Sequence, residues 1–227
     1  MESKTITQKI SKIKYPEPEK NDQKSDRIWT WAVLLAFSTA LFVVAALIAH
    51  KHTFGGVELS VFRHINDWPN GLRPFFLAVT LAPESLWIGV ATVIILFALK
   101  MYRAVWQLAA AIFGGYAAAL LAKHFIGRPR PIGFLNDAHI RANETGMGFP
   151  SGHTMMVTIV VLILWPYLPK GWRWLTLGFI PLMGLSRIYL GVHEPLDTIG
   201  GFALGAMVVS AIRVALLILE KRKIITW

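Results

Sequence analysis

The sequence predicts an all-α integral membrane protein with six transmembrane helices and an interfacial helix between the first and the second. Of its 227 residues, 55% are hydrophobic and only 16% are charged, whereas a soluble domain carries about 25% charged residues. The hydrophobic residues form long runs, and six runs approach the roughly 20 residues that a helix needs to cross a bilayer. Aromatic residues gather where the fourth and fifth runs meet (Trp165, Tyr167, Trp172 and Trp174), as they do at membrane–water interfaces.

The apolar runs define the edges of the predicted spans. These spans are 28–49, 76–99, 104–126, 152–168, 173–190 and 197–219. Pro181 lies inside the fifth span and is expected to kink it, because proline removes a helical hydrogen bond. The mixed segment 53–72, which contains VELSVFRHINDW, predicts an amphipathic helix that lies in the membrane interface.

Short polar tails flank the predicted membrane domain at 28–219. Residues 1–27 contain seven Lys and Arg residues and the segment YPEPEK, which is typical of a solvated, disordered tail. Residues 220–227 form the predicted C-terminal tail. A cleaved signal peptide is not expected, because the first apolar run is too long and no small-residue cleavage pattern follows it.

Basic residues beside the spans predict the orientation of the chain. With six spans both tails lie on one side, which would hold fourteen Lys and Arg residues against five on the other, motif residues aside. The richer side is predicted to be cytoplasmic. The loops 50–75, 127–151 and 191–196 then face outward from a plasma or inner cell membrane.

Composition also excludes several functions. The net charge of +10 does not predict nucleic-acid binding, because the basic residues punctuate apolar runs and form no basic patch with interleaved aromatics. The sequence contains no Cys, so disulfides, thiolate chemistry and Cys-based metal sites are excluded. Nothing in the sequence indicates an oligomeric state.

Three polar clusters fall on the predicted outer face. They are KHFIGRPRP (Lys123–Pro131), FPSGHT (Phe149–Thr154) and SRIYLGVHEPLD (Ser186–Asp197). Each has a structural interpretation of its own, because basic side chains snorkel at helix ends and Pro-Ser-Gly or Glu-Pro segments begin helices. Charges in membrane spans are costly and are usually paired or functional, so three clusters at one depth favour a single site.

The side chains in these clusters suit a phosphate group. Phosphoryl transfer spreads negative charge over three equatorial oxygens and depends on positioned positive donors. Lys123, Arg130 and Arg187 supply positive charge, the two Arg with a forked geometry that matches phosphate. Ser151 adds a hydroxyl, and Gly152 at the start of the fourth span lets backbone amides approach an anion.

Two His residues remain for the chemistry. Asp197 falls in the first turn of a helix that Pro195 begins, and a carboxylate there can reach back to the residues before the helix. We therefore expect Asp197 to orient His193 as a nucleophile. His153 faces the predicted anion pocket and suits protonation of the leaving oxygen.

The same clusters resemble the three-part signature of the type-2 phosphatidic acid phosphatase (lipid phosphate phosphatase) superfamily. That signature is Lys, six residues and Arg-Pro, then Pro-Ser-Gly-His, then Ser-Arg, five residues, His, three residues and Asp. It is met at Lys123–Pro131, at 150–153 and at Ser186–Asp197, with no departure at any position. The six-span arrangement extends the similarity over 28–219.

The resemblance implies a lipid phosphatase that works without a metal or other cofactor. It implies that His193 takes up the phosphate as phosphohistidine, that Asp197 orients it and that His153 protonates the leaving group. It assigns phosphate binding to Lys123, Arg130, Ser151, Gly152 and Arg187.

The substrate class follows from the family and from the small size of the loops. Members that resemble this chain act on lipid phosphates and pyrophosphates, including undecaprenyl pyrophosphate and phosphatidylglycerol phosphate. The chain has almost no extramembrane domain, so the bilayer must present the substrate. An outward-facing site favours undecaprenyl pyrophosphate, whose hydrolysis recycles the carrier lipid. Four further basic residues in and near the clusters are interpreted as solvated loop residues, with a role in the choice of lipid headgroup as the alternative: His124, His139, Arg128 and Arg141.

Other functions stay open. Phosphatidylglycerol phosphate and phosphatidate are alternative substrates, and a phosphotransferase would pass the phosphate to a second lipid instead of to water. A vanadate-dependent haloperoxidase resembles the family around the same signature, but such proteins are larger and soluble. A non-catalytic scaffold or channel would use the charges as structural pairs.

Overall fold

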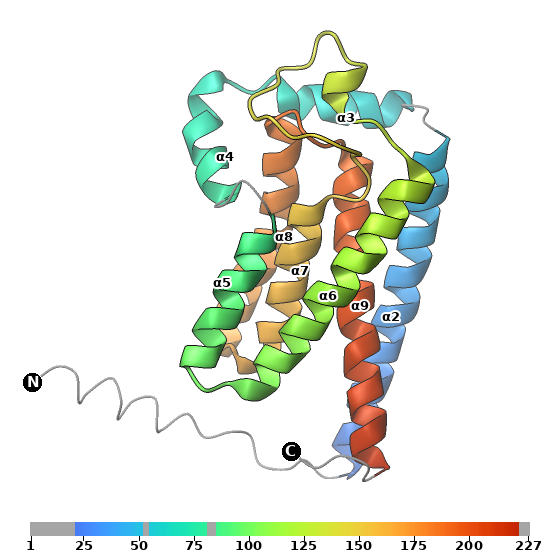
Figure 1. Cartoon of the computed structure of the whole chain (residues 1–227), viewed down its shortest axis with the longest axis vertical. Coiled ribbons are helices and arrows are strands. Elements are labelled where there is room, and N and C mark those ends of the chain that lie inside the picture. Colours follow the sequence, from blue (N-terminus) through green and yellow to red (C-terminus); the bar gives the residue numbers. More distant parts are fainter. Residues whose placement is uncertain (1–20, 52–54, 81–84, 223–227) are drawn as a thin grey trace, which may run out of the picture.

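The structure is a computed structural model, which describes residues 21–51, 55–80 and 85–222. Every regular element in these ranges is helical, which confirms the all-α prediction. The elements are α2 (Asn21–His50), α3 (Gly56–Asn66), η1 (Asn70–Leu72), α4 (Arg73–Thr80), α5 (Ser85–Ala98), α6 (Tyr102–Ile126), η2 (Pro131–Gly133), α7 (Gly152–Leu164), η3 (Trp165–Tyr167), α8 (Lys170–Tyr189) and α9 (Pro195–Lys221). The long helices run along one axis of the molecule, and α3 lies across one end of them (Figure 1).

The predicted tails are only partly covered by the structure. Residues 1–20 and 223–227 lie outside the described residues, whereas residues 21–27 form the first turns of α2. The first predicted span, 28–49, lies wholly inside α2.

Among the described residues, three helical segments are both long and apolar enough to cross a membrane: Arg27–His50, Tyr102–Ile126 and Pro195–Lys221. They coincide with the first, third and sixth predicted spans. Two further apolar helices, Leu86–Ala98 and Gly152–Tyr167, are shorter. Six crossings therefore stay a prediction.

The prediction of one continuous span over 76–99 was wrong. The structure has two separate helices there, with α4 packed on α8 and α5 packed on α6 and α7. The sequence contains Pro83 between them, and proline both lacks an N–H donor and clashes with the carbonyl four residues earlier in a helix. The apolar content of a run does not by itself distinguish one long helix from two shorter ones.

Helix α3 lies within the segment 53–72 that was predicted to form an amphipathic helix. Its buried residues Phe62, Ile65 and Asn66 face the bundle, whereas Val57 is 81% exposed. The side-chain amide of Asn66 donates to the carbonyl of Tyr189 at 3.1 Å, which fixes α3 to the end of α8. The position of α3 at a membrane surface stays a prediction.

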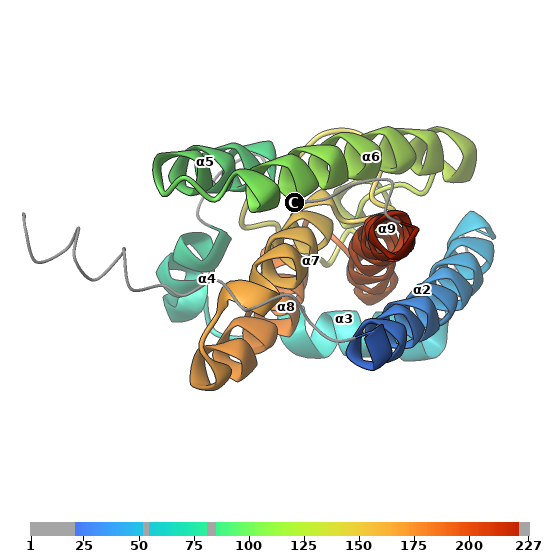
Figure 2. The same ribbon diagram turned by 90° about the horizontal axis from the view of Figure 1, so that it is seen from below.

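Helix α7 lies at the centre of the bundle, where it contacts α5, α6, α8 and α9 (Figure 2). Its apolar residues Met155, Ile159 and Ile163 have 0% exposed surface. The outer helices have the opposite pattern, since Phe113 and Phe125 of α6 are 80% and 71% exposed. Exposed aromatic surface of this extent is expected where lipid, rather than water, surrounds a helix.

Two glycines of α9 let α7 approach it at backbone distance. A Cβ at Gly201 would lie 2.4 Å from the carbonyl oxygen of Ser151, and one at Gly205 would lie 2.7 Å from that of Met155. Atoms cannot be that close, so only glycine fits either position. The start of α7 is thereby held against the start of α9.

Candidate active site

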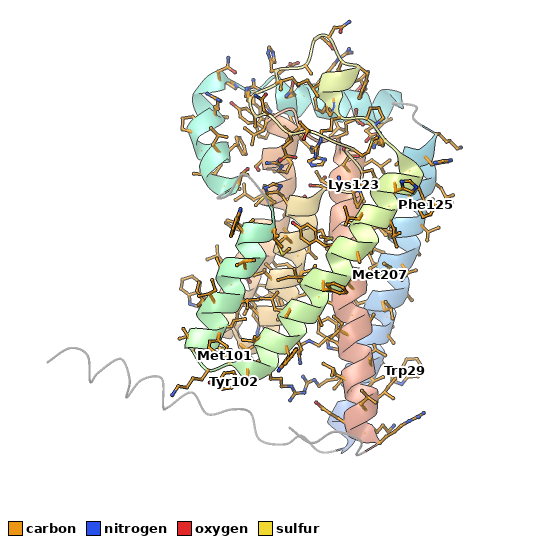
Figure 3. The ribbon with its side chains drawn as sticks, viewed as in Figure 1. Trp29, Met101, Tyr102, Lys123, Phe125 and Met207 are labelled. Atoms are coloured by element: carbon orange, nitrogen blue, oxygen red, sulfur yellow. The ribbon has the colours of Figure 1, made fainter. Side chains whose placement is uncertain are left out.

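The three polar clusters lie at one end of the bundle. Helix α6 ends in the first cluster, α7 begins in the second, and the third joins α8 to α9. Figure 3 shows Lys123 near this end of α6, whereas Trp29, Met101 and Tyr102 lie toward the opposite end. The structure thus brings the predicted site residues to one level of the molecule.

His193 lies in the turn between α8 and α9, and only 1% of it is exposed. Its Nδ1 lies 3.3 Å from Oδ2 of Asp197, and its Nε2 lies 3.1 Å from Nη1 of Arg130. A guanidinium can only donate, so Nε2 accepts and Nδ1 carries the proton that it donates to Asp197. This is the tautomer in which Nε2 can attack an electrophile.

Asp197 is fixed by the cap of α9. Pro195 begins the helix, and Oδ2 of Asp197 accepts the backbone N–H of Glu194 at 3.1 Å in a capping box. This is the backward reach that the sequence predicted for Asp197. The carbonyl of Asp197 also accepts the N–H of Ser151 at 2.9 Å, which joins the cap of α9 to that of α7.

The environment of His193 keeps its ring neutral. Burial lowers the pKa of His193 well below 6.5, and the positive charges of Arg130, Arg187 and Lys123 lower it further. Both causes disfavour the charged imidazolium. At neutral pH the ring therefore has a lone pair on Nε2.

The basic side chains of the clusters lie near the His193 ring, with Arg130 at its Nε2; we call the space that they share with Nε2 the anion pocket. Arg130 and Arg187 are 8% and 1% exposed. Nε of Arg130 donates to the carbonyl of Gly146 at 3.2 Å, and Nζ of Lys123 donates to that of Met147 at 2.6 Å. Nε of Arg187 has no hydrogen-bond partner among the described residues, so this buried donor is available to a ligand oxygen.

A carboxylate that the sequence analysis missed lies between these cations. Oε2 of Glu144 lies 2.8 Å from Nη1 of Arg130 and 3.7 Å from Nε2 of His193. Oε1 pairs with Nη2 of Arg187 and lies 3.7 Å from Nδ1 of His153. Nothing in the sequence marks Glu144, because it stands in a polar loop outside all three clusters.

The start of α7 brings the second cluster to the same pocket. Ser151 is the N-cap residue and Gly152 the first residue of the helix, directly before His153. Ser151 is fully buried, and its Oγ accepts a hydrogen bond from Oγ1 of Thr154 at 3.2 Å. Because His153 contacts Glu144, this first turn borders the anion pocket.

A second buried charge cluster lies beside Asp197. Arg128 donates to Oε2 of Glu58 at 2.7 Å and to Oδ1 of Asp197 at 3.2 Å, and it lies 2.5 Å from Oε2 of Glu194. Glu58, from α3, also accepts the N–H of Leu196 at 3.0 Å. Helix α3 is thereby bonded to the start of α9.

Three carboxylates share one guanidinium in this cluster. Burial raises the pKa of Glu194 to about 9; Arg128 opposes this rise, and the charges of Asp197 and Glu58 add to it. Glu194 therefore keeps its proton at neutral pH. A neutral Glu194 removes one negative charge, so the acids of this cluster exceed its one cation by one charge rather than by two.

The interpretation of Arg128 and Arg141 as solvated loop residues was wrong. They are only 1% and 8% exposed. Arg141 donates to the carbonyl of Tyr189 at 2.8 Å, while Arg128 pairs with Glu58, 70 positions away in the chain. The acids that bury Arg128 are remote in sequence, so no local pattern marks it. His124 and His139 are exposed, as the sequence analysis expected.

Residues 104–219 match the PAP2 superfamily. This range includes all three clusters. The chain belongs to the PAP2 superfamily.

Individual relatives agree with this assignment. An undecaprenyl-diphosphatase from Sulfolobus acidocaldarius is 30% identical over 189 residues, which are 80% of this chain and 88% of that protein. The crystal structure of Aquifex aeolicus LpxE has a TM-score of 0.64 and 27% identity, and covers 70% of this chain and 96% of that one. A transmembrane PAP2-type phosphatidylglycerolphosphate phosphatase from Bacillus subtilis has the same fold, with a TM-score of 0.61 at 23% identity over 84% of this chain and 98% of its own. The family resemblance drawn from the three clusters is thereby confirmed.

The range that matches the PAP2 superfamily also includes site residues that the sequence did not predict. Glu144 and Arg128 lie within it, together with the eight predicted site residues, whereas Glu58 of α3 lies outside it. In the part of the chain that the structure describes, no group of three or more His, Asp and Glu is arranged to hold a metal ion. The site carboxylates face basic side chains instead, Glu144 pairing with Arg130 and Arg187, and Asp197 with Arg128.

Proposed function

We propose that this PAP2 protein is a metal-independent membrane phosphatase that hydrolyses a lipid pyrophosphate or phosphate through a phosphohistidine intermediate. One observation carries the proposal: a neutral His193, oriented by Asp197, faces a pocket with Arg130 and Arg187. The carboxylate of Glu144 in the same pocket supports its affinity for anions.

In the first step, Nε2 of His193 attacks the terminal phosphorus of the lipid. A P–N bond forms while the bond from phosphorus to the leaving oxygen breaks, and His153 gives its proton to that oxygen. Asp197 stabilises the positive charge that the His193 ring acquires. Arg130 and Arg187 neutralise the charge that develops on the equatorial oxygens.

In the second step, water attacks the phosphohistidine. His153, now neutral, accepts a proton from that water. The P–N bond breaks, inorganic phosphate forms, and His193 returns to its neutral state. The two steps together consume one water and release one phosphate and the dephosphorylated lipid.

The proposed substrate is undecaprenyl pyrophosphate, which would yield undecaprenyl phosphate for reuse as a carrier lipid. The support is the 30% identity to an undecaprenyl-diphosphatase over 80% of this chain. The exposed apolar surface of the outer helices suits a substrate that reaches the site from the bilayer.

The proposed arrangement has six spans, with α3 in the interface and the site on the extracytoplasmic side. The start of α2 and the end of α9 lie at the end of the bundle opposite the site (Figure 1). Four basic residues lie in the connections α5–α6 and α7–α8 or in the first turn of the helix that follows: Lys100, Arg103, Lys170 and Arg173. The positive-inside rule favours a cytoplasmic location for that end. A single Cys at position 137 should react with an impermeant thiol reagent on intact cells, and one at position 170 only after lysis; the reverse pattern would refute this orientation.

The test of function is phosphate release from a panel of lipids with EDTA present. Undecaprenyl pyrophosphate, phosphatidylglycerol phosphate and phosphatidate are compared with the wild-type chain and two variants. His193→Ala should lower turnover at least about 10⁴-fold, because the nucleophile is gone, and should form no phosphoenzyme. His139→Ala removes an exposed imidazole from the same end of the molecule and should stay within about twofold of wild type.

Each outcome of the panel has a definite meaning. Release that needs a divalent metal, or that survives in His193→Ala, would refute the mechanism. Faster release from phosphatidylglycerol phosphate or phosphatidate would change the substrate and keep the mechanism. Labelled phosphate that ends on a second lipid would identify a phosphotransferase.

A further inference from the structure

The carboxylate of Glu144 occupies the space in front of the proposed nucleophile. Oε2 lies 3.7 Å from Nε2 of His193, the atom that would attack phosphorus, and 2.8 Å from Nη1 of Arg130. Oε1 contacts Arg187 and lies 3.7 Å from His153. A phosphate in this pocket needs the same four partners, so it and the carboxylate cannot be bound at once.

The loop that carries Glu144 is held by the same basic side chains. Met147 and Gly146 offer their carbonyls to Lys123 and Arg130, at 2.6 and 3.2 Å. Among the described residues, every hydrogen bond and ion pair to 143–147 comes from these two, from Arg187 or from the two site His residues. A phosphate that takes up these donors therefore releases the loop as well as the carboxylate.

Both flanks of this loop are fixed independently of the pocket. The N–H of Arg141 donates to the carbonyl of Leu190 at 2.9 Å, and that of Gly148 donates to the carbonyl of Arg128 at 2.8 Å. Asn143 and Thr145, on either side of Glu144, are exposed. The segment 142–147 can therefore turn outward between two fixed points.

The buried arginines explain why an internal anion is present. Arg130 and Arg187 are almost completely removed from water, and a buried charge is strongly unfavourable unless it is paired. In the absence of substrate Glu144 supplies the missing negative charge.

We propose that Glu144 is an internal competitor for the phosphate pocket, which occupies the place of the transferred phosphoryl group until the substrate displaces it together with the loop 142–147. This inference rests on the proposed function, because it takes the pocket to be the phosphate site. It assigns to Glu144 the control of substrate affinity, so that only lipids whose phosphate outcompetes a tethered carboxylate are bound.

The competitor should weaken the apparent affinity for any phosphate-like anion. When the competent state is only a fraction of the population, the apparent dissociation constant rises by the inverse of that fraction. An open fraction of about one tenth therefore corresponds to an affinity about tenfold weaker than that of a pocket without the competitor.

The first experiment measures the binding of inorganic phosphate and of orthovanadate by calorimetry, with the full chain in detergent. Glu144→Gln removes the charge and keeps the shape, and it should bind both anions about tenfold more tightly than wild type. Asp137→Asn is the matched control, since it makes the same change in an exposed residue of the same connection, paired with Arg63. It should leave both affinities within about twofold. Equal affinities of wild type and Glu144→Gln would overturn the inference.

The second experiment follows the loop itself while Glu144 is intact. The sequence contains no Cys, so one spin label can be placed through Thr145→Cys and, as a control, through Asp137→Cys. Saturating phosphate should increase label mobility at position 145 and leave position 137 unchanged. Unchanged mobility at 145 would overturn the inference even if Glu144→Gln failed to fold.

These results are distinguishable from a failure of the proposed function. If wild type releases phosphate from lipids and Glu144→Gln binds anions no more tightly, only the role of Glu144 is wrong. If Glu144→Gln loses turnover without a gain in anion affinity, Glu144 acts in the chemistry and is no competitor. If wild type neither binds phosphate nor hydrolyses any lipid, the proposed function itself fails.

Discussion

The two sides of the His193 ring border charge clusters of opposite composition. On the Nε2 side the cations Lys123, Arg130 and Arg187 outnumber the one acid Glu144, and on the Nδ1 side the acids Glu58, Glu194 and Asp197 outnumber the one cation Arg128. The first cluster keeps an excess of positive charge that the single carboxylate of Glu144 does not offset. In the second cluster a proton on Glu194 reduces the acid excess from two charges to one. The difference fits the proposed mechanism, in which one side of the ring binds the substrate and the other orients the ring.

The largest expected effect comes from breaking the orienting side at the ring. Asp197→Asn replaces the acceptor of the Nδ1 proton by a group that can also donate, which favours the wrong tautomer of His193. We expect kcat to fall roughly 10³-fold or more, with KM changed only a few fold. Steady-state kinetics on the preferred lipid measure both constants.

The contrast variant is Arg187→Ala, on the binding side. It should lower kcat/KM about 10²-fold, because one positioned donor is lost. It should also weaken inhibition by vanadate. Vanadate affinity should stay near wild type in Asp197→Asn. If both variants weaken vanadate equally, the division between a binding and an orienting side is wrong.

A smaller effect, on stability, is expected from Arg128→Met. Removing this cation leaves the carboxylates of Glu58 and Asp197 buried without their partner, and breaking a buried pair costs about 3–5 kcal/mol. Unfolding in detergent followed by circular dichroism measures the loss.

Arg213→Met provides the comparison for Arg128→Met. Arg213 of α9 is also buried, but it donates to the carbonyl of Ile163 at 3.0 Å rather than to a carboxylate. Its replacement should cost about 1–2 kcal/mol. An Arg128 variant as stable as the Arg213 variant would show that the acid cluster does not depend on its cation.

The smallest effect concerns the pH dependence of stability. The folded pKa of Glu194 is raised from 4.5 to about 9, so between these values the folded state binds more protons than the unfolded state. The contribution of this group to stability is therefore fully present below 4.5 and is lost as the pH rises through about 9. Thermal unfolding from about pH 6 to about pH 10 should show a falling midpoint in wild type and a shallower fall in Glu194→Gln. Parallel curves would contradict the raised pKa.

The helices could be predicted from the sequence where the deciding feature is local. The apolar runs at 28–49, 104–126 and 197–219 each became one long helix, because length and hydropathy are properties of the run itself. The run at 76–99 did not, since it holds parts of two helices, α4 and α5, although its average composition resembles that of one continuous span.

The site divides in the same way. Asp197 could be placed against His193 because the two are four positions apart across a helix cap. Glu144 could not be placed against Arg187, 43 positions away, nor Arg128 against Glu58, 70 positions away. Such pairs depend on how helices and loops pack in three dimensions. No periodic pattern in a single sequence predicts that packing.

The close approach of Gly201 to the carbonyl of Ser151 fixes the distance between the starts of α7 and α9. Main chain touches main chain there, so no side-chain rotamer can lengthen or shorten the gap between the turns that bear His153 and Asp197. The proposed proton donor and the acid proposed to orient the nucleophile thus keep a fixed separation.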